Sequence, residues 1–205
     1  MTFHFLSEKL LIQQTKEVEL WHKSFEKIEM SSPLEFTKLV SMQHQINFEL
    51  WHKEDLARDP VASDSEIANV KRAIDILNQK RNDFIEQMDQ FLVNFLKSEK
   101  IKIIKDAEMN SETPGNIIDR LSINALKIFH MEEETKREGV DNIILKSTEE
   151  KLEILVEQRR DLGQCLFKLL DDLYKGKKFL KIYRQMKMYN DKNLNPVLYK
   201  KKQIS

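Results

Sequence analysis

Apolar residues recur three and four positions apart along most of this chain, and such spacing predicts long amphipathic helices. The clearest pattern runs from about Ser63 to Lys97, where the capping box Ser63-Asp64-Ser65-Glu66 opens a helix. Its apolar seam comprises Ile67, Val70, Ile74, Leu77, Phe84, Met88, Phe91 and Phe95. A heptad seam of this kind is typical of bundles whose helices cross at about 20°.

The same reading predicts four further long helices. Capping residues, first-turn prolines and terminal glycines set their ends. The expected ranges are Ser7 to Glu29, Pro33 to Asp59 with Ser32 as cap, Pro114 to Glu138 with Gly139 at its end, and Ile143 or Ser147 to Lys175. Ile101-Lys102-Ile103-Ile104 is the only strand candidate, and it has no partner. The sequence therefore predicts an all-α, antiparallel bundle of about five long helices.

The C-terminal segment differs in charge from the rest of the chain. From residue 175 to 205 there are ten Lys or Arg and one Asp, although the whole chain is neutral. We expect a bundle domain over 1–174 and a basic segment over 175–205 that packs on the same domain. A short basic helix from Lys177 to Met188 is predicted, followed by a tail pinned by Tyr189, Leu194, Pro196 and Tyr199.

Composition narrows the class of protein. The 205 residues include only 4 Gly and 4 Pro, so few turns are available and the elements must be long. No run of about 18 apolar residues predicts a membrane span, and the first residues lack a signal-peptide pattern. The single Cys165 suits a reducing compartment. We expect a cytoplasmic protein without a nucleic-acid partner.

Two arginines, Arg81 and Arg159, interrupt apolar seams. A buried, unpaired guanidinium is costly, so each needs a carboxylate or an anionic ligand unless its end reaches solvent. One interpretation is a buried ion pair that fixes helix register, with Glu86, Asp75 or Asp119 as partner. The other is an anion site formed by both arginines, since the guanidinium fork suits carboxylate and phosphate alike.

Polar side chains form rows on the second and third predicted helices. On the third, Asp75, Asn78, Asn82, Glu86 and Asp89 share one row beside Arg81. Asp55, Glu86 and Asp89 are candidates for holding Mg²⁺, because carboxylates are its preferred protein ligands. On the second helix, His52 with Asp55 or Glu54 could form a general acid–base pair. The alternative there is a hydrogen-bonded histidine near a helix end.

Two short segments of the chain contain histidine in recognisable patterns. Glu19-x-x-His22 and Glu49-x-x-His52 have the spacing of di-iron bundles, but such sites also need bridging glutamates from two other helices. Leu20-Trp21-His22-Lys23 and Leu50-Trp51-His52-Lys53 repeat four letters, which is too short to establish a duplication. The sequence contains no Gly-rich phosphate loop, zinc spacing or nucleophile elbow.

Several stretches resemble a known bacterial family. They are NFELWHKEDLAR (47–58), KRAIDILNQKRNDFIEQMD (71–89), ETPGNIIDRLSINALKIFHM (112–131) and KMYNDKNLNPVLY (187–199). Together they resemble the family called domain of unknown function 4254, DUF4254. The resemblance implies a helical protein of envelope glycan assembly, because members lie beside glycosyltransferases of envelope polysaccharide pathways. The family's recurring polar positions fall here on His52, Glu54, Asp55, Arg58, Arg81, Asn82, Glu86, Asp119, Arg120 and Lys127.

Three functional hypotheses follow. In the first, the bundle is a binding or accessory protein for a phosphate-bearing ligand such as a sugar nucleotide or glycan precursor. The anion would contact Arg58, Arg81, Asn82, Arg120 and Lys127, while His52, Asp55 and Glu86 line the same cleft. No cofactor is needed. The second is a Mg²⁺-dependent all-α nucleotide pyrophosphohydrolase using Asp55, Glu86 and Asp89. The third is an adaptor that docks on a glycosyltransferase.

Overall fold

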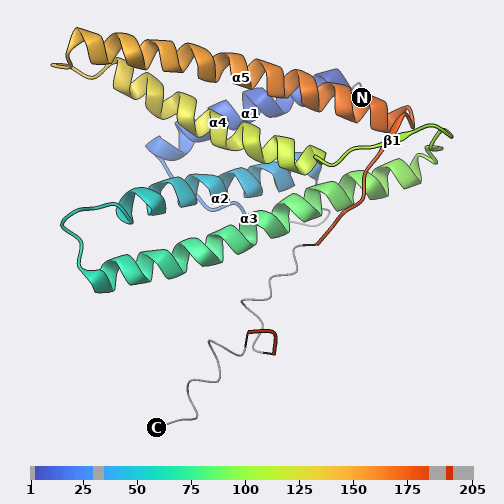
Figure 1. The fold of residues 1–205 in the computed structure, drawn as a ribbon, viewed down its shortest axis with the longest axis horizontal. Helices are drawn as coiled ribbons and strands as arrows, with labels where there is room; N and C mark the ends of the chain where they lie inside the picture. The colour runs from blue at the N-terminus through green and yellow to red at the C-terminus, as the bar shows by residue number, and fades with distance from the viewer. Residues whose placement is uncertain (1–2, 30–34, 185–192, 196–205) are drawn as a thin grey trace.

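A computed structural model of the chain describes residues 3–29, 35–184 and 193–195 (Figure 1). Within these ranges the regular structure consists of five long helices and two very short strands. The helices are α1 (Phe3–Lys23), α2 (Phe36–Leu56), α3 (Asp64–Ser98), α4 (Pro114–Thr135) and α5 (Asn142–Tyr174). Strands β1 (Glu108–Met109) and β2 (Lys178–Phe179) pair in parallel. The prediction of an all-α helical bundle is confirmed. No described helix is long and apolar enough to cross a membrane.

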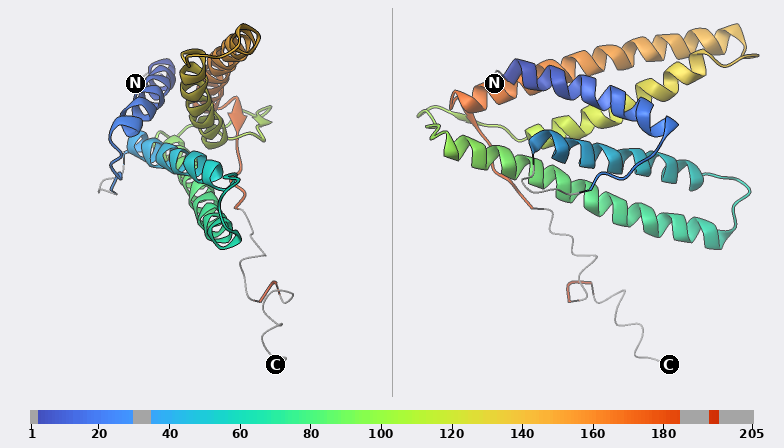
Figure 2. Two further views of the ribbon diagram at one scale, coloured as in Figure 1. Left: turned by 90° about the vertical axis from the view of Figure 1, so that its left-hand side faces the viewer. Right: turned by 180° about the vertical axis from the view of Figure 1, so that it is seen from behind.

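Not all neighbouring helices of the bundle are antiparallel, although the sequence predicts an antiparallel bundle. Helices α2 and α3 form one antiparallel hairpin, and α4 and α5 form another (Figure 1). Helix α1, however, runs in the same direction as α2 and α4, as the right-hand view of Figure 2 also shows. The Gln14 carbonyl accepts a bond from His44, and the Gln14 amide donates to the Ile118 carbonyl. The C-terminal ends of α1, α2 and α4 therefore lie at one end of the bundle.

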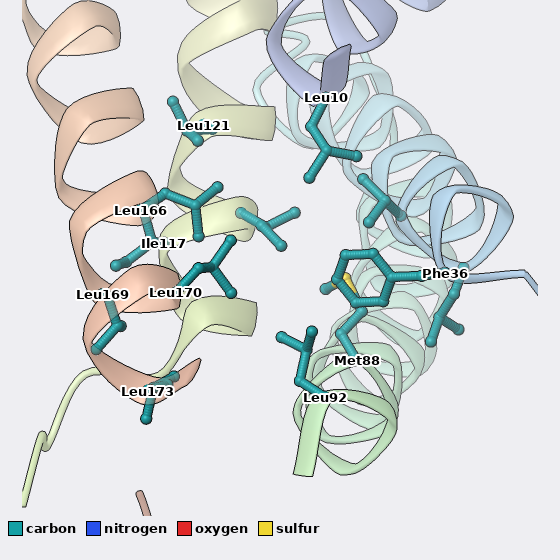
Figure 3. Packing of buried hydrophobic residues seen from close by; sticks show 13 residues of the cluster. Leu10, Phe36, Met88, Leu92, Ile117, Leu121, Leu166, Leu169, Leu170 and Leu173 are labelled. Carbon is teal, nitrogen blue, oxygen red and sulfur yellow. The ribbon is translucent and has the colours of Figure 1, made fainter. Parts of the chain in front are cut away.

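The main core combines residues from all five helices (Figure 3). Each helix contributes a side chain with 1% or less of its surface exposed: Leu10, Leu39, Met88, Ile118 and Leu166. Burying one such side chain is worth about 1.5–3 kcal/mol, so this contact set outweighs any intrinsic helix propensity.

Local signals set the start of two helices as predicted. Ser63 accepts a bond from the Glu66 amide and Glu66 reaches back to Ser63, which completes the capping box of α3. Thr113 caps α4 ahead of Pro114. Immediately afterwards, a side chain at Gly115 would place its Cβ 2.8 Å from the Ile85 carbonyl oxygen. The close approach of α3 and α4 therefore requires glycine at that position.

Helix α1 ends six residues before the predicted end at Glu29. The amide of Gln45 on α2 explains the early end. It donates to the Glu26 carbonyl over 2.7 Å and accepts from the Ile28 amide over 3.0 Å. These bonds replace those that a continued helix would have made. Phe25 then stacks on Phe48, with ring centres 5.4 Å apart.

The predicted range of α2 was too long at both ends. Glu35 has an extended backbone, so the helix begins at Phe36 instead of continuing from Pro33. The predicted cap at Ser32 lies outside the described residues. At the other end α2 stops at Leu56, three residues before Asp59. Helix α4 likewise stops at Thr135 rather than Glu138.

The predicted basic helix beginning at Lys177 is wrong in its described part. Gly176 adopts a left-handed conformation with φ of +67°, which ends α5. The next residues pair with the segment before α4, where the Glu108 amide donates to the Lys177 carbonyl and the Asn110 amide to that of Phe179. Leu180 packs on the main core, whereas Tyr183 is 74% exposed. Of the predicted tail anchors, Tyr189, Pro196 and Tyr199 lie outside the described residues.

Candidate functional site

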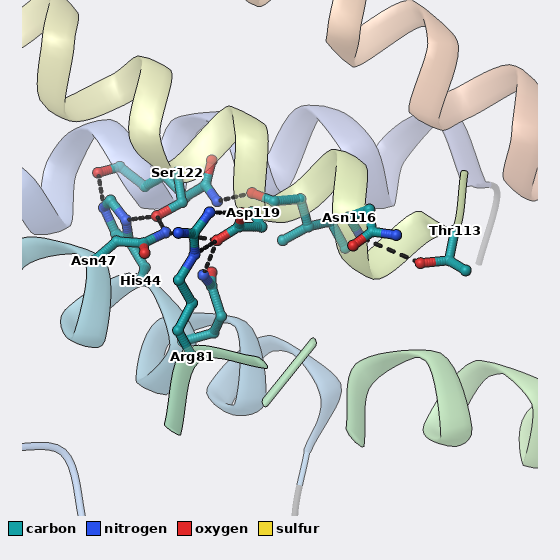
Figure 4. Close-up of polar contacts among 10 residues, drawn as sticks. His44, Asn47, Arg81, Thr113, Asn116, Asp119 and Ser122 are labelled. Carbon is teal, nitrogen blue, oxygen red and sulfur yellow. Dashed lines mark hydrogen bonds and ion pairs between the residues drawn. The ribbon is translucent and has the colours of Figure 1, made fainter. Parts of the chain in front are cut away.

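Asp119 on α4 is the centre of a buried polar network (Figure 4). Arg81 on α3 donates to it twice, from Nε over 2.8 Å and from Nη2 to the second carboxylate oxygen. This bond raises the pKa of the Arg81 guanidinium, although burial acts in the opposite direction. Of the three predicted partners, Asp119 is therefore the one that pairs with Arg81.

The network continues from Asp119 into α2. Gln43 Nε2 and Asn47 Nδ2 donate to Asp119 over 2.6 and 2.9 Å. Asn47 also donates to the Ser122 hydroxyl, which lies 2.6 Å from His44 Nδ1. His44 Nε2 donates to a backbone carbonyl on α1 over 2.9 Å. One hydrogen-bonded chain thus joins four helices.

His44 is held in its neutral form by its surroundings. The side chain is fully buried, and burial lowers its pKa to about 3 because an imidazolium cannot be solvated there. Its two bonds are satisfied by a neutral ring that donates from Nε2 and accepts at Nδ1. This histidine is therefore a fixed part of the network near neutral pH.

Arg159 on α5 does not pair with any of the three predicted carboxylates. Its guanidinium donates to the carbonyl oxygens of Leu121 on α4 and Leu11 on α1, over 2.9 and 2.7 Å. Burial lowers its pKa to about 10. Within the described part of the chain, the cavity that Arg81 lines is not lined by Arg159. Arg159 thus ties three helices together through backbone acceptors.

Beside the network lies a cavity of about 410 Å³ between α2, α3 and α4, which we call the central cleft. It collects three of the predicted site residues, Asp55, Arg58 and Arg81. Its complete lining is Asn47, Leu50, Trp51, Glu54, Asp55, Arg58, Asn78, Arg81, Ile123 and Leu126. The cleft therefore combines an indole, aliphatic groups, two amides, two carboxylates and two guanidinium groups.

The two arginines of the central cleft differ in their freedom. The Arg81 side chain is only 27% exposed and is committed to Asp119. Arg58 is 68% exposed and uses Nη1 for the Glu54 backbone carbonyl and carboxylate, the latter over 3.2 Å. Within the described residues, Nη2 and Nε of Arg58 make no hydrogen bond. Arg58 is the better placed of the two to receive an anion.

The other predicted anion contacts lie elsewhere. Lys127 lines a neighbouring cavity of about 500 Å³, the outer cavity, together with Trp51, His130, Met131, Glu134, Lys151, Ile154 and Leu155. Trp51 lines both cavities. Asn82 and Glu86 line a third, of about 150 Å³. Arg120 is exposed and pairs with Glu112 over 2.7 Å. The predicted set is thus divided among several surfaces.

The candidate Mg²⁺ ligands are not brought together. Asp55 lines the central cleft, while Glu86 and Asp89 line the 150 Å³ cavity. Asp89 instead accepts the Gly115 amide over 2.7 Å, and burial raises its pKa to about 6. Among the described residues, the group of three metal-ligating side chains in close reach consists of histidines: His22, His52 and His130.

The raised pKa of Asp89 leads to a prediction about stability. Below pH 3.8 the carboxyl is neutral in both folded and unfolded chains. Between pH 3.8 and about 6 the unfolded chain loses this proton while the folded chain keeps it, so the free energy of unfolding falls as pH rises through about 6. From pH 3.5 to 7.5 we expect Asp89→Asn to gain about 3 kcal/mol in free energy of unfolding relative to wild type. Urea titrations measure it. The exposed Asp83→Asn is the matched control; an equal gain there would contradict the prediction.

Sequence reasoning overlooked some members of the network. Gln43 and Ser122 were not identified from the sequence, although both have no exposed surface and bond to Asp119 and His44 of the network. The sequence offered part of the signal, because five of the eight residues from Ser41 to Phe48 are polar, and the structure shows that this whole run is buried. Buried polar groups require partners, so such a run indicates a network.

The fold and the cleft define an all-α bundle protein in which a buried polar network forms one wall of a mixed polar and apolar cavity. The chain belongs to the family described as protein of unknown function (DUF4254), whose model matches residues 37–182. That range begins in α2 and extends just beyond β2. No curated protein and no solved structure matches the chain.

Proposed function

We propose that this protein binds a phosphate-bearing ligand, a sugar nucleotide or glycan precursor, in the central cleft, as an accessory factor in envelope polysaccharide synthesis. The observation that carries the proposal is the shared cavity of Asp55, Arg58 and Arg81 beside Trp51. The pathway is an expectation from the family resemblance, with a glycosyltransferase as its expected partner.

The chemistry of the cleft suits such a ligand. The free donors of Arg58 match the oxygens of a phosphate group, and its exposure leaves room for one. The Trp51 indole offers an apolar surface for a sugar or base. Asn78, Asp55 and the exposed edge of Arg81 supply donors and acceptors for hydroxyl groups. Arg81 serves as a fixed wall, since Asp119 already holds it.

We expect UDP-glucose or GDP-mannose to bind the full-length, tag-free chain with a dissociation constant that weakens 10- to 100-fold in Arg58→Ala. Loss of one charge-assisted contact, worth about 1.5–3 kcal/mol, gives a change of that size. A thermal-shift screen selects the ligand, and calorimetry in EDTA then measures affinity. Adding UDP and inorganic phosphate separately shows which part of the ligand is recognised.

Arg120→Ala is the matched control. Arg120 is also an exposed arginine with one carboxylate partner, but it does not line the central cleft. Equal weakening in both variants would contradict the cleft and favour a wider anion surface. Failure of all four compounds to shift the melting temperature would contradict the proposed ligand class.

The other two hypotheses have distinct signatures in the same assays. A pyrophosphohydrolase would release a nucleoside monophosphate once Mg²⁺ replaces EDTA, and Asp55→Asn would abolish release. An adaptor would bind a glycosyltransferase with unchanged affinity in Arg58→Ala. The structure favours neither by a specific contact, and it separates Asp55 from Glu86 and Asp89.

A further inference from the structure

Three histidines from distant parts of the sequence meet at one end of the bundle. His22 lies in the last turn of α1, His52 near the end of α2 and His130 near the end of α4. One ring nitrogen from each lies within 4.8 Å of the other two. We call these residues the histidine cluster. It is separate from the central cleft, whose lining contains none of the three.

Hydrogen bonds fix the tautomers of two of these rings. His22 Nδ1 lies 2.8 Å from the Val18 carbonyl oxygen, and His130 Nδ1 lies 2.9 Å from the Glu133 carboxylate. Both oxygens can only accept, so each Nδ1 carries the proton. In the neutral ring, Nε2 then presents a lone pair. Metal-binding histidines are typically oriented in this way, by a carbonyl or carboxylate on the other nitrogen.

The two Nε2 atoms lack partners of their own. Nε2 of His22 and Nε2 of His130 are both buried and make no hydrogen bond. Buried polar atoms are nearly always bonded, so two such atoms in one cluster require an explanation. A cation that accepts both lone pairs provides one. Ring packing alone would not, because an apolar contact leaves each lone pair unsatisfied.

The spacing of the rings suits a single ion. Their centres are 5.2 Å apart for His22 and His52, 4.9 Å for His22 and His130, and 5.9 Å for His52 and His130. A tetrahedral Zn²⁺ about 2.0–2.1 Å from each nitrogen would place ring centres roughly 5.2 Å apart. Stacking of His130 on Trp51 and of His22 on Phe129 holds two rings near these positions.

We propose that His22, His52 and His130 bind one Zn²⁺ ion, with Glu133 positioning His130 from behind. Three neutral imidazoles are a zinc ligand set that leaves the fourth position open. The ion would join the C-terminal ends of three parallel helices. Since His22 precedes the matched range 37–182, the complete site depends on α1 as well as on the family domain.

The test titrates Zn²⁺ into chelator-treated, tag-free, full-length protein by calorimetry. A Cys165→Ser background removes the exposed thiol as a competing ligand. We expect one ion per chain, with affinity at least 100-fold weaker in His52→Gln and in His130→Gln. His22→Gln is a third variant that should weaken Zn²⁺ binding. Circular dichroism establishes that each variant is folded. Co²⁺ should give the visible bands of a tetrahedral complex, which the same variants lose.

Glu133→Gln tests the positioning role. Loss of the carboxylate behind His130 should weaken Zn²⁺ binding 10- to 100-fold while the stoichiometry stays at one. Glu134→Gln is the matched control, since Glu134 is the next residue, is about equally exposed and pairs with Arg137 instead. His4→Gln is a second control, because His4 lies in the first turn of the same helix as His22, about 27 Å along the helix axis at 1.5 Å per residue.

Three results would overturn the site. They are absence of Zn²⁺ binding in the folded Cys165→Ser protein, His52→Gln and His130→Gln variants that bind Zn²⁺ as tightly as that parent protein, and equal weakening by Glu134→Gln and Glu133→Gln. None of them bears on sugar-nucleotide binding, which is measured in EDTA.

Discussion

Replacing Arg81 with leucine should lower the free energy of unfolding by about 3–5 kcal/mol, because Asp119 would remain buried without its cationic partner. Asp119 is only 7% exposed on its side chain, so solvent cannot replace the two lost bonds. Gln43 and Asn47 would still donate, but neither carries charge. Urea unfolding at pH 7 followed by circular dichroism measures the change.

Arg120→Leu is the control for this experiment. Arg120 has the same side chain and an ion pair of 2.7 Å, but it is 57% exposed, so its loss should cost at most about 1 kcal/mol. The double variant Arg81→Leu, Asp119→Leu should recover part of the loss, since no buried charge remains. A cost below 1 kcal/mol for Arg81→Leu would show that the pair contributes little to stability.

Acid should destabilise the wild-type protein through His44. The pKa of His44 is about 6.5 in the unfolded chain and about 3 in the folded chain. Its contribution to the free energy of unfolding is therefore complete above pH 6.5. That contribution is lost as pH falls through about 3, because the unfolded chain takes up the proton first. The full span corresponds to about 5 kcal/mol, of which about 3 kcal/mol is lost by pH 4. Asp89 opposes this between pH 3.8 and 6, so the wild-type profile is flatter than His44 alone would make it.

His44→Gln isolates the effect, because Asp89 is unchanged in both proteins. We expect the stability difference between wild type and variant to shrink by about 3 kcal/mol from pH 7 to pH 4. Chemical unfolding at half-unit steps of pH gives the curve. A constant difference across this range would mean that His44 takes up its proton as readily in the folded chain as in the unfolded chain, contrary to its burial and its bonds with Ser122 and Gln14.

The sequence by itself determined the helices and some of their ends. Periodicity and capping are local properties, so the seam from Ile67 to Phe95 and the caps at Ser63 and Thr113 were readable without a structure. Other helix ends could not be predicted. Gln45 of α2 bonds to the backbone that follows α1 and ends that helix, and pairing with β1 makes Lys178 and Phe179 a strand instead of part of the predicted helix. Long-range bonds there outcompete local preference.

The tertiary structure alone decided which polar residues meet. The connection over residues 24–35 can span about 40 Å, enough to return along α2, whose 21 residues extend about 31 Å. That reach allows α1 to run parallel to α2, so the repeated Leu-Trp-His-Lys segments lie side by side with His22 and His52 in contact. Helical spacing gives the face of each residue, whereas helix direction and neighbours depend on burial of the shared core. For that reason the selected set Arg58, Arg81, Asn82, Arg120 and Lys127 is divided among separate surfaces, while an unselected histidine, His130, completes a cluster.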